Sequence, residues 1–75
     1  MPLRGASRRA RLRGVRLVDS YGTRFWEIIY VQDESPDELR KAYIGMESVY
    51  EDPRPGDNVI ITFIADKAAS IHQTD

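Results

Sequence analysis

The chain contains no cysteine and a single histidine, His72. Without thiolates it forms neither a disulfide nor a cysteine-ligated zinc site, which are common supports of very small domains. One histidine without a neighbouring serine and aspartate builds no catalytic triad. We therefore predict a non-enzymatic protein with no cofactor and no metal ion. Its stability would depend on packing, on ion pairs or on a second copy of the chain.

Long apolar runs are also missing. The longest uninterrupted ones span residues 28–31 and 59–61, far short of the roughly 20 residues that a membrane-spanning helix requires. No apolar segment follows the arginine-rich start, as a secretory signal would require. We therefore expect a cytoplasmic protein that has no membrane partner. The lack of cysteine fits that compartment.

Acidic residues are absent from the first sixteen positions, which hold six arginines. Residues 17–75 hold five basic residues against twelve acids, so a net charge of −1 conceals a basic start and an acidic remainder. Proline, glycine and small side chains favour a mobile basic arm over residues 1–8. A composition of 41% hydrophobic and 31% charged residues is typical of a folded chain. Residues 9–75 have room for a single small globular domain.

Polar and apolar residues alternate over the rest of the basic segment. On one side of an extended chain the alternation places Arg9, Arg11 and Arg13. The phase flips near Gly14, where a glycine can host a bulge, so residues 10–19 are interpreted as one bent strand. Turn residues over 19–23 lead into a run at 23–32 that is apolar on both faces. This pattern predicts a hairpin whose second strand is central in the sheet.

Residues 36–51 are open to two interpretations. Ser35 as a cap, the proline that follows and Glu38 three residues on are typical of a helix start. Apolar residues then recur at helical spacing and stop before Pro53, so we predict a helix. The rival interpretation is a strand over 42–50 that follows a surface loop, and the helix-weakening glycine at position 45 favours it.

A turn over 52–57 precedes an apolar, β-branched run at 58–65, which predicts another central strand. Residues 68–72 add a short edge strand. The expected fold class is α+β, a small antiparallel-hairpin sheet with one helix on a face in the order β-β-α-β, plus that fourth strand. If the helix prediction fails, the same segments form an all-β, five-stranded small barrel of the OB or SH3-like kind.

Two further features concern carboxylates. The acidic cluster at 33–38 matches no EF-hand spacing, and helix capping and solubility account for it. Glu27 lies in an otherwise apolar strand and needs a partner if it is buried. Arg11 or Arg13, across the hairpin, is the partner that we expect.

The candidate binding residues are basic and aromatic. Arginines suit phosphates, and aromatic rings on a neighbouring strand stack unpaired bases. We predict a small module that binds RNA or DNA through the arginine-rich arm and strand. Its predicted site residues are Arg4, Arg8, Arg9, Arg11, Arg13, Arg16, Trp26 and Tyr30. The alternative is a protein-interaction or self-assembling module whose basic arm docks on an acidic surface. That surface is formed by residues 33–38 and 47–52 of this chain or of a second copy, or belongs to a protein partner. No small-molecule substrate is inferred.

Overall fold

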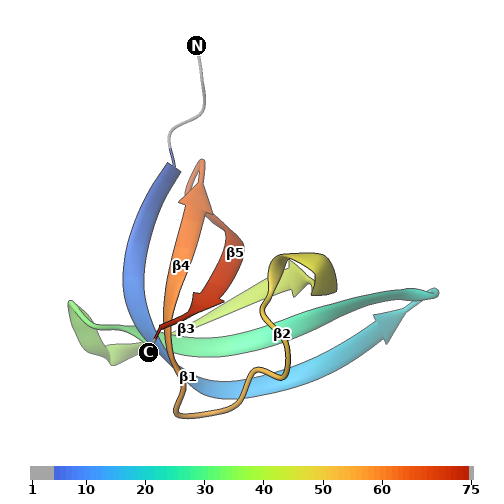
Figure 1. Ribbon diagram of the computed structural model, residues 1–75, viewed down its shortest axis with the longest axis horizontal. Helices are drawn as coiled ribbons and strands as arrows, with labels where there is room; N and C mark the ends of the chain where they lie inside the picture. The colour runs from blue at the N-terminus through green and yellow to red at the C-terminus, as the bar shows by residue number, and fades with distance from the viewer. Residues whose placement is uncertain (1–4, 75) are drawn as a thin grey trace.

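The computed structural model describes residues 5–74, and most of them lie in one antiparallel β-sheet (Figure 1). The strands are β1 (Gly5–Ser20), β2 (Thr23–Gln32), β3 (Ser35–Gly45), β4 (Asn58–Ile64) and β5 (Lys67–Gln73), with a short 3₁₀ turn, η1 (Met46–Ser48). Their order in the sheet is β3-β2-β1-β4-β5. Within this part of the chain, no helix is long and apolar enough to cross a membrane.

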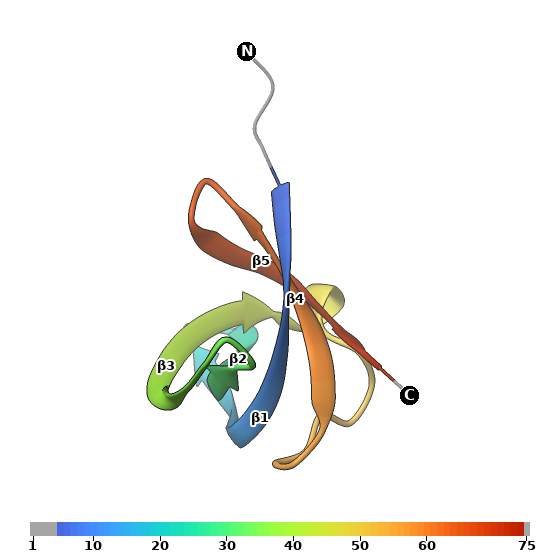
Figure 2. The same ribbon diagram turned by 90° about the vertical axis from the view of Figure 1, so that its left-hand side faces the viewer.

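Strand β1 is shared by the two halves of the sheet. Its first half pairs with β4, where Gly5 lies opposite Ile64, and its second half pairs with β2. The strand is strongly curved, so the sheet folds over on itself (Figure 2). A parallel bridge between Val49 and Ile71 brings the chain after β3 next to β5. The result is a small, partly open five-stranded barrel in which β1 pairs with both β2 and β4, as the all-β alternative expects.

The α+β prediction, with a helix over 36–51, is wrong. Residues 35–45 form β3, which pairs with β2 from Arg40 opposite Tyr30 to Gly45 opposite Phe25. The all-β alternative fits the structure. The physical reason is that β2 is apolar on both faces and leaves backbone groups free along one edge. Pairing that edge satisfies those groups and places Ile44 in the core, at 3% exposure.

The hairpin prediction is confirmed. Tyr21 and Gly22 form its two-residue turn with φ of 52° and 81°, as a type I′ turn requires. The register of β1 against β2 shifts between Leu12 and Gly14, which is the predicted change of phase. Arg13 is the extra residue of this bulge. The strand is longer than expected, because residues 5–8, expected as arm, pair with β4.

The core lies between the two halves of the folded sheet. Its largest fully buried side chains come from β1, β2, β4 and β5, and they are Leu12, Ile28, Val59, Ile61 and Ile71. They occupy alternate positions of their strands, so the residues between them face outward. On either side of Ala10 and Leu12, the outward positions of β1 are therefore those of Arg9, Arg11 and Arg13.

The loop before β4 is tied to β1 at the bulge. The Gly56 N–H donates to the Leu12 carbonyl oxygen at 2.7 Å, and the Leu12 N–H donates to the Asp57 carbonyl oxygen at 2.9 Å. The Tyr50 hydroxyl donates to Asp57 Oδ2 at 2.6 Å, and the Arg54 N–H donates to the same oxygen at 3.1 Å. These bonds hold β1 in place where its outer arginines project.

Candidate nucleic-acid interface

Three arginines of β1 lie together on the outer surface of the barrel. The residues between them, Ala10 and Leu12, are 2% and 0% exposed, so the arginines point to solvent. We call Arg9, Arg11 and Arg13 the arginine stripe. Among the described residues, none of the three forms a salt bridge, although Arg11 Nε donates to Asn58 Oδ1 at 3.3 Å. Their positive charge is therefore available to a ligand.

The other predicted arginines are placed differently. Arg8 lies two positions from Ala10 and so belongs to the opposite side of β1, where its Nε is 3.4 Å from Glu34 Oε1. Arg16 follows the bulge and pairs with Glu27. Arg4 lies outside the described residues. The structure therefore groups three of the six predicted arginines into one stripe with no carboxylate partner.

Arg16 and Glu27 form a fork-shaped ion pair across the hairpin. Arg16 Nε is 3.2 Å from Glu27 Oε1, and Nη2 is 3.0 Å from Oε2. These hydrogen bonds lower the pKa of the Glu27 carboxyl and raise the pKa of the Arg16 guanidinium. The predicted partners, Arg11 and Arg13, are wrong because the bulge shifts the register and brings Arg16 opposite Glu27. The one acid in the middle of this surface is thus neutralised.

The two aromatic residues predicted to stack bases do not reach this surface. Tyr30 is 3% exposed and belongs to the core, and Trp26 is partly buried and packs against the core from the inner side of β2. Apart from Tyr21 in the hairpin turn, the exposed aromatic ring of the described chain is Tyr43 of β3, at 58% exposure. It makes an edge-to-face contact with Phe25, with the ring centroids 5.8 Å apart and the planes at 82°.

The predicted site omits Tyr43 because a helix is predicted over residues 36–51, which does not place this ring beside β2. A period-two reading of the same residues groups Tyr43 with Leu39 and Lys41 on one face of a strand. Phe25 was missed for a different reason. Strand β2 is apolar on both faces, so its pattern does not show which of its aromatic residues points outward.

The strand register arranges these groups in rows across the outer surface. From β1 across β2 to β3, the rows are Gly14, Ile29 and Lys41, then Arg16, Glu27 and Tyr43, then Val18, Phe25 and Gly45. In these rows Arg16 lies on one side and Lys41 and Tyr43 lie on the other, and Arg13 of the arginine stripe lies at the bulge next to Gly14. The side chains between them, on β2, are Ile29, Phe25 and the Glu27 carboxylate that Arg16 holds.

Shallow hollows flank the far end of the arginine stripe. One is lined by Arg11 and Arg13 together with Val31, Gln32, Asp33 and Pro36. The other lies on the opposite side of the same two arginines and is lined by Leu12, Pro55 and Gly56. Both arginines therefore stand on a ridge with space on either side, which a phosphate group can enter.

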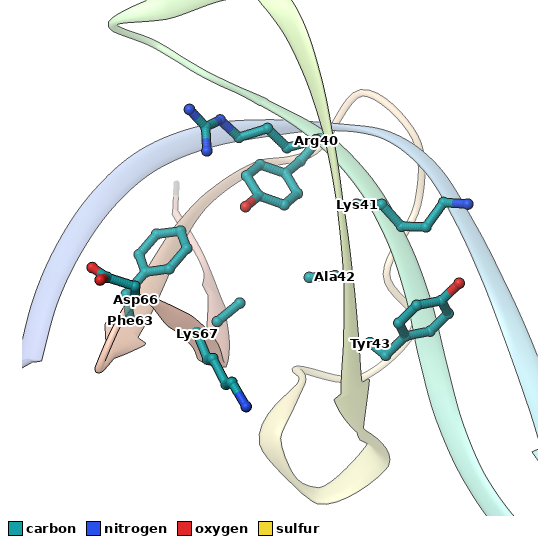
Figure 3. A pocket seen from close by; sticks show the side chains of 9 residues that line it. Arg40, Lys41, Ala42, Tyr43, Phe63, Asp66 and Lys67 are labelled. Atoms are coloured by element: carbon teal, nitrogen blue, oxygen red, sulfur yellow. The ribbon is translucent and has the colours of Figure 1, made fainter.

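A separate hollow of about 530 Å³ lies at the seam between β3 and the β4–β5 turn (Figure 3). Its floor includes Tyr30 and Phe63, and its rim carries Arg40, Lys67 and Asp66. No nucleophile paired with a base lines it. Over residues 5–74, no three histidine, aspartate or glutamate side chains come together as metal ligands.

Comparison with known proteins adds no relative: no protein-family model matches the chain, and neither a curated protein nor a solved structure matches it significantly.

Proposed function

We propose that this chain is a non-enzymatic module that binds single-stranded nucleic acid across the outer face of β1, β2 and β3. The observation that carries the proposal is the arginine stripe, three exposed cations that have no carboxylate partner in the described chain. Its last member, Arg13, lies at the bulge next to the row of Gly14, Ile29 and Lys41, and the row after that ends at Tyr43. Arginine donors would contact phosphates, and Tyr43 would stack on a base. A cytoplasmic location is part of this proposal.

Single strands suit this surface better than a duplex. Stacking on Tyr43 requires an exposed base face, which a duplex hides inside its own stack. A groove of positive charge beside aromatic rings is the usual arrangement for binding single strands without strong sequence preference. The acidic remainder of the chain does not oppose this, because a local charge distribution determines the field at a binding surface.

The test is fluorescence anisotropy of labelled single-stranded DNA, single-stranded RNA and duplex DNA over a range of salt concentrations. The variant Arg9→Gln/Arg11→Gln/Arg13→Gln removes the arginine stripe. Three phosphate contacts to a single strand give a slope of log K against log salt of about −2, since each contributes about −0.7. We expect the variant to lose most of this slope and to bind at least about tenfold more weakly at low salt.

A matched control removes the same charge elsewhere. The variant Arg24→Gln/Arg54→Gln/Lys67→Gln changes three exposed cations outside the proposed surface and should keep the salt slope. Tyr43→Ala should weaken single-strand binding while leaving the weaker duplex binding unchanged, because only unpaired bases stack. The proposal is overturned if the wild-type chain binds none of the probes at low salt. It also fails if both triple variants behave alike.

A further inference from the structure

Strands β3 and β5 are the two ends of the sheet, and each pairs with only one neighbour. In the part of the chain that the structure describes, β3 itself pairs with no strand at its outer edge, because the bridge between Val49 and Ile71 lies after η1. Residues 40–43 face the β4–β5 turn only across the hollow of about 530 Å³. Most of the outer edge of β3 is therefore free. An exposed edge of this kind pairs readily with another strand unless its side chains prevent it.

The free edge of β3 presents backbone donors and acceptors at alternate residues. Ser20 and Thr23 flank the two-residue hairpin turn and so form a hydrogen-bonded pair. Because backbone direction alternates along a strand, the N–H and C=O groups of the even residues of β2 point toward β3. Their partners in the register are Arg40, Ala42 and Ile44, whose backbone groups therefore point toward β2. The N–H and C=O groups of Lys41 and Tyr43 consequently point away from the sheet.

The segment just before these residues is only loosely held by β2. The register shifts between Tyr30 and Gln32, and residues 36–39 of β3 lie opposite Val31 alone. Leu39, in this bulged segment, is 64% exposed. The backbone there has no regular ladder on either side, which leaves it free to pair outward.

The side chains along this edge have a self-complementary order of charge. Residues 37–41 of β3 are two acids, Leu39 and then two bases. If two copies lie antiparallel about a twofold axis through Leu39, Asp37 comes opposite the partner's Lys41. The same axis brings Glu38 opposite the partner's Arg40. Opposite charges directly across an antiparallel pair attract, and like charges repel, so the pattern favours this one register.

The faces of the strand agree with this register. Arg40 lies on the pocket side of β3, whereas Lys41 and Tyr43 lie on the other side (Figure 3). Glu38 shares the face of Arg40, since Arg40 Nη2 is 2.7 Å from Glu38 Oε2. Glu38 thus lies on the same face as Arg40, the base that it would meet in the second copy, and alternation along the strand gives Asp37 the face of Lys41.

We propose that two copies of this chain associate through their β3 edges, antiparallel about Leu39, to form a homodimer with a continuous sheet. Such an interface is isologous, because both copies use the same surface and every contact across the twofold axis occurs twice. Charged side chains usually prevent an exposed edge strand from pairing with another chain, but the order of charges along β3 favours pairing with the same edge of a second copy. The dimer uses no residue of the arginine stripe.

The test is sedimentation velocity from low micromolar to millimolar protein, without nucleic acid. The variants Asp37→Lys/Glu38→Arg and Arg40→Glu/Lys41→Glu each place like charges opposite one another. Each should self-associate at least about tenfold more weakly than the wild-type chain. An equimolar mixture of the two variants should restore a dimer that contains one copy of each, because their charges are again complementary.

A matched control, Asp19→Lys/Glu51→Arg, reverses two exposed acids away from β3 and should dimerise as the wild type does. A wild-type chain that stays monomeric at millimolar concentration overturns the proposal and shows that the charged side chains prevent β3 from pairing with a second copy. A dimer that ignores both β3 variants, or a mixture that forms no heterodimer, overturns it as well. The assay contains no nucleic acid, so its outcome is independent of nucleic-acid binding, and the Asp37→Lys/Glu38→Arg variant also leaves Lys41 and the arginine stripe unchanged.

Discussion

Replacement of Tyr50 by phenylalanine tests whether the loop before β4 holds the barrel together. The Tyr50 hydroxyl donates to Asp57 Oδ2 at 2.6 Å in a partly buried contact. Asp57 also closes the loop onto β1, because its carbonyl oxygen accepts the Leu12 N–H at 2.9 Å. The substitution removes one hydroxyl and keeps the ring, so the change in stability reports on the hydrogen bond.

The expected loss follows from the kind of bond. A hydrogen bond to a charged group contributes about 1.5–3 kcal/mol to stability. Asp57 Oδ2 retains the Arg54 N–H as a second donor and is only partly buried, which favours the lower end. We therefore expect a loss of about 1–2 kcal/mol in the free energy of unfolding. For a domain of this size, that corresponds to a fall in Tm of roughly 6–12 °C.

The same bond predicts a pH dependence with a definite sign. Burial, and then the hydrogen bond to Asp57, raises the pKa of Tyr50. A raised pKa in the folded state stabilises the protein below the unfolded value of about 10, and this contribution is lost as the pH rises further. Tyr50→Phe has no such titration. The difference in stability between the two proteins should therefore shrink above pH 10.

The assay is urea unfolding followed by circular dichroism at neutral pH and above pH 10. Tyr21→Phe is the control, because Tyr21 is fully exposed at the hairpin turn and its hydroxyl makes no hydrogen bond in the described structure. The control should unfold as the wild type does. A Tyr50→Phe variant as stable as the control, or a difference that does not change with pH, would refute the reasoning.

Two smaller perturbations test the hairpin. Gly22→Ala places a side chain at a φ of 81° and should lower the free energy of unfolding by about 1 kcal/mol. The loss is measured as a fall in Tm relative to the control Gly5→Ala, whose added Cβ makes only ordinary contacts. Equal Tm values for the two variants would contradict the turn assignment. Glu27→Gln should destabilise the protein at neutral pH, because Arg16 lowers the pKa of the Glu27 carboxyl. This stability is present above the unfolded pKa of about 4.3 and is lost as the pH falls through the lowered folded value. The gap between Glu27→Gln and the wild type in urea unfolding should therefore close in strong acid, and a constant gap would show that the ion pair does not contribute.

The parts of the structure that were predicted correctly depend on local signals. The β1–β2 hairpin follows from turn residues with a glycine that accepts positive φ. The arginine stripe follows from alternation alone, because successive residues of a strand point to opposite faces. The change of phase near Gly14 was likewise visible in the order of polar and apolar residues, and the structure has a bulge there.

The sequence by itself therefore determined the hairpin, the two central strands and the grouping of Arg9, Arg11 and Arg13. Only the tertiary structure decided that residues 35–45 form a strand, since the edge of β2 supplies hydrogen bonds that outweigh a local helix signal. It also decided that Tyr43 is exposed while Trp26 and Tyr30 pack in or against the core, and which arginine pairs with Glu27. A single extra residue in β1 changes the cross-strand partner of every residue that follows it. The order of residues within one strand does not indicate which residues of another strand lie opposite.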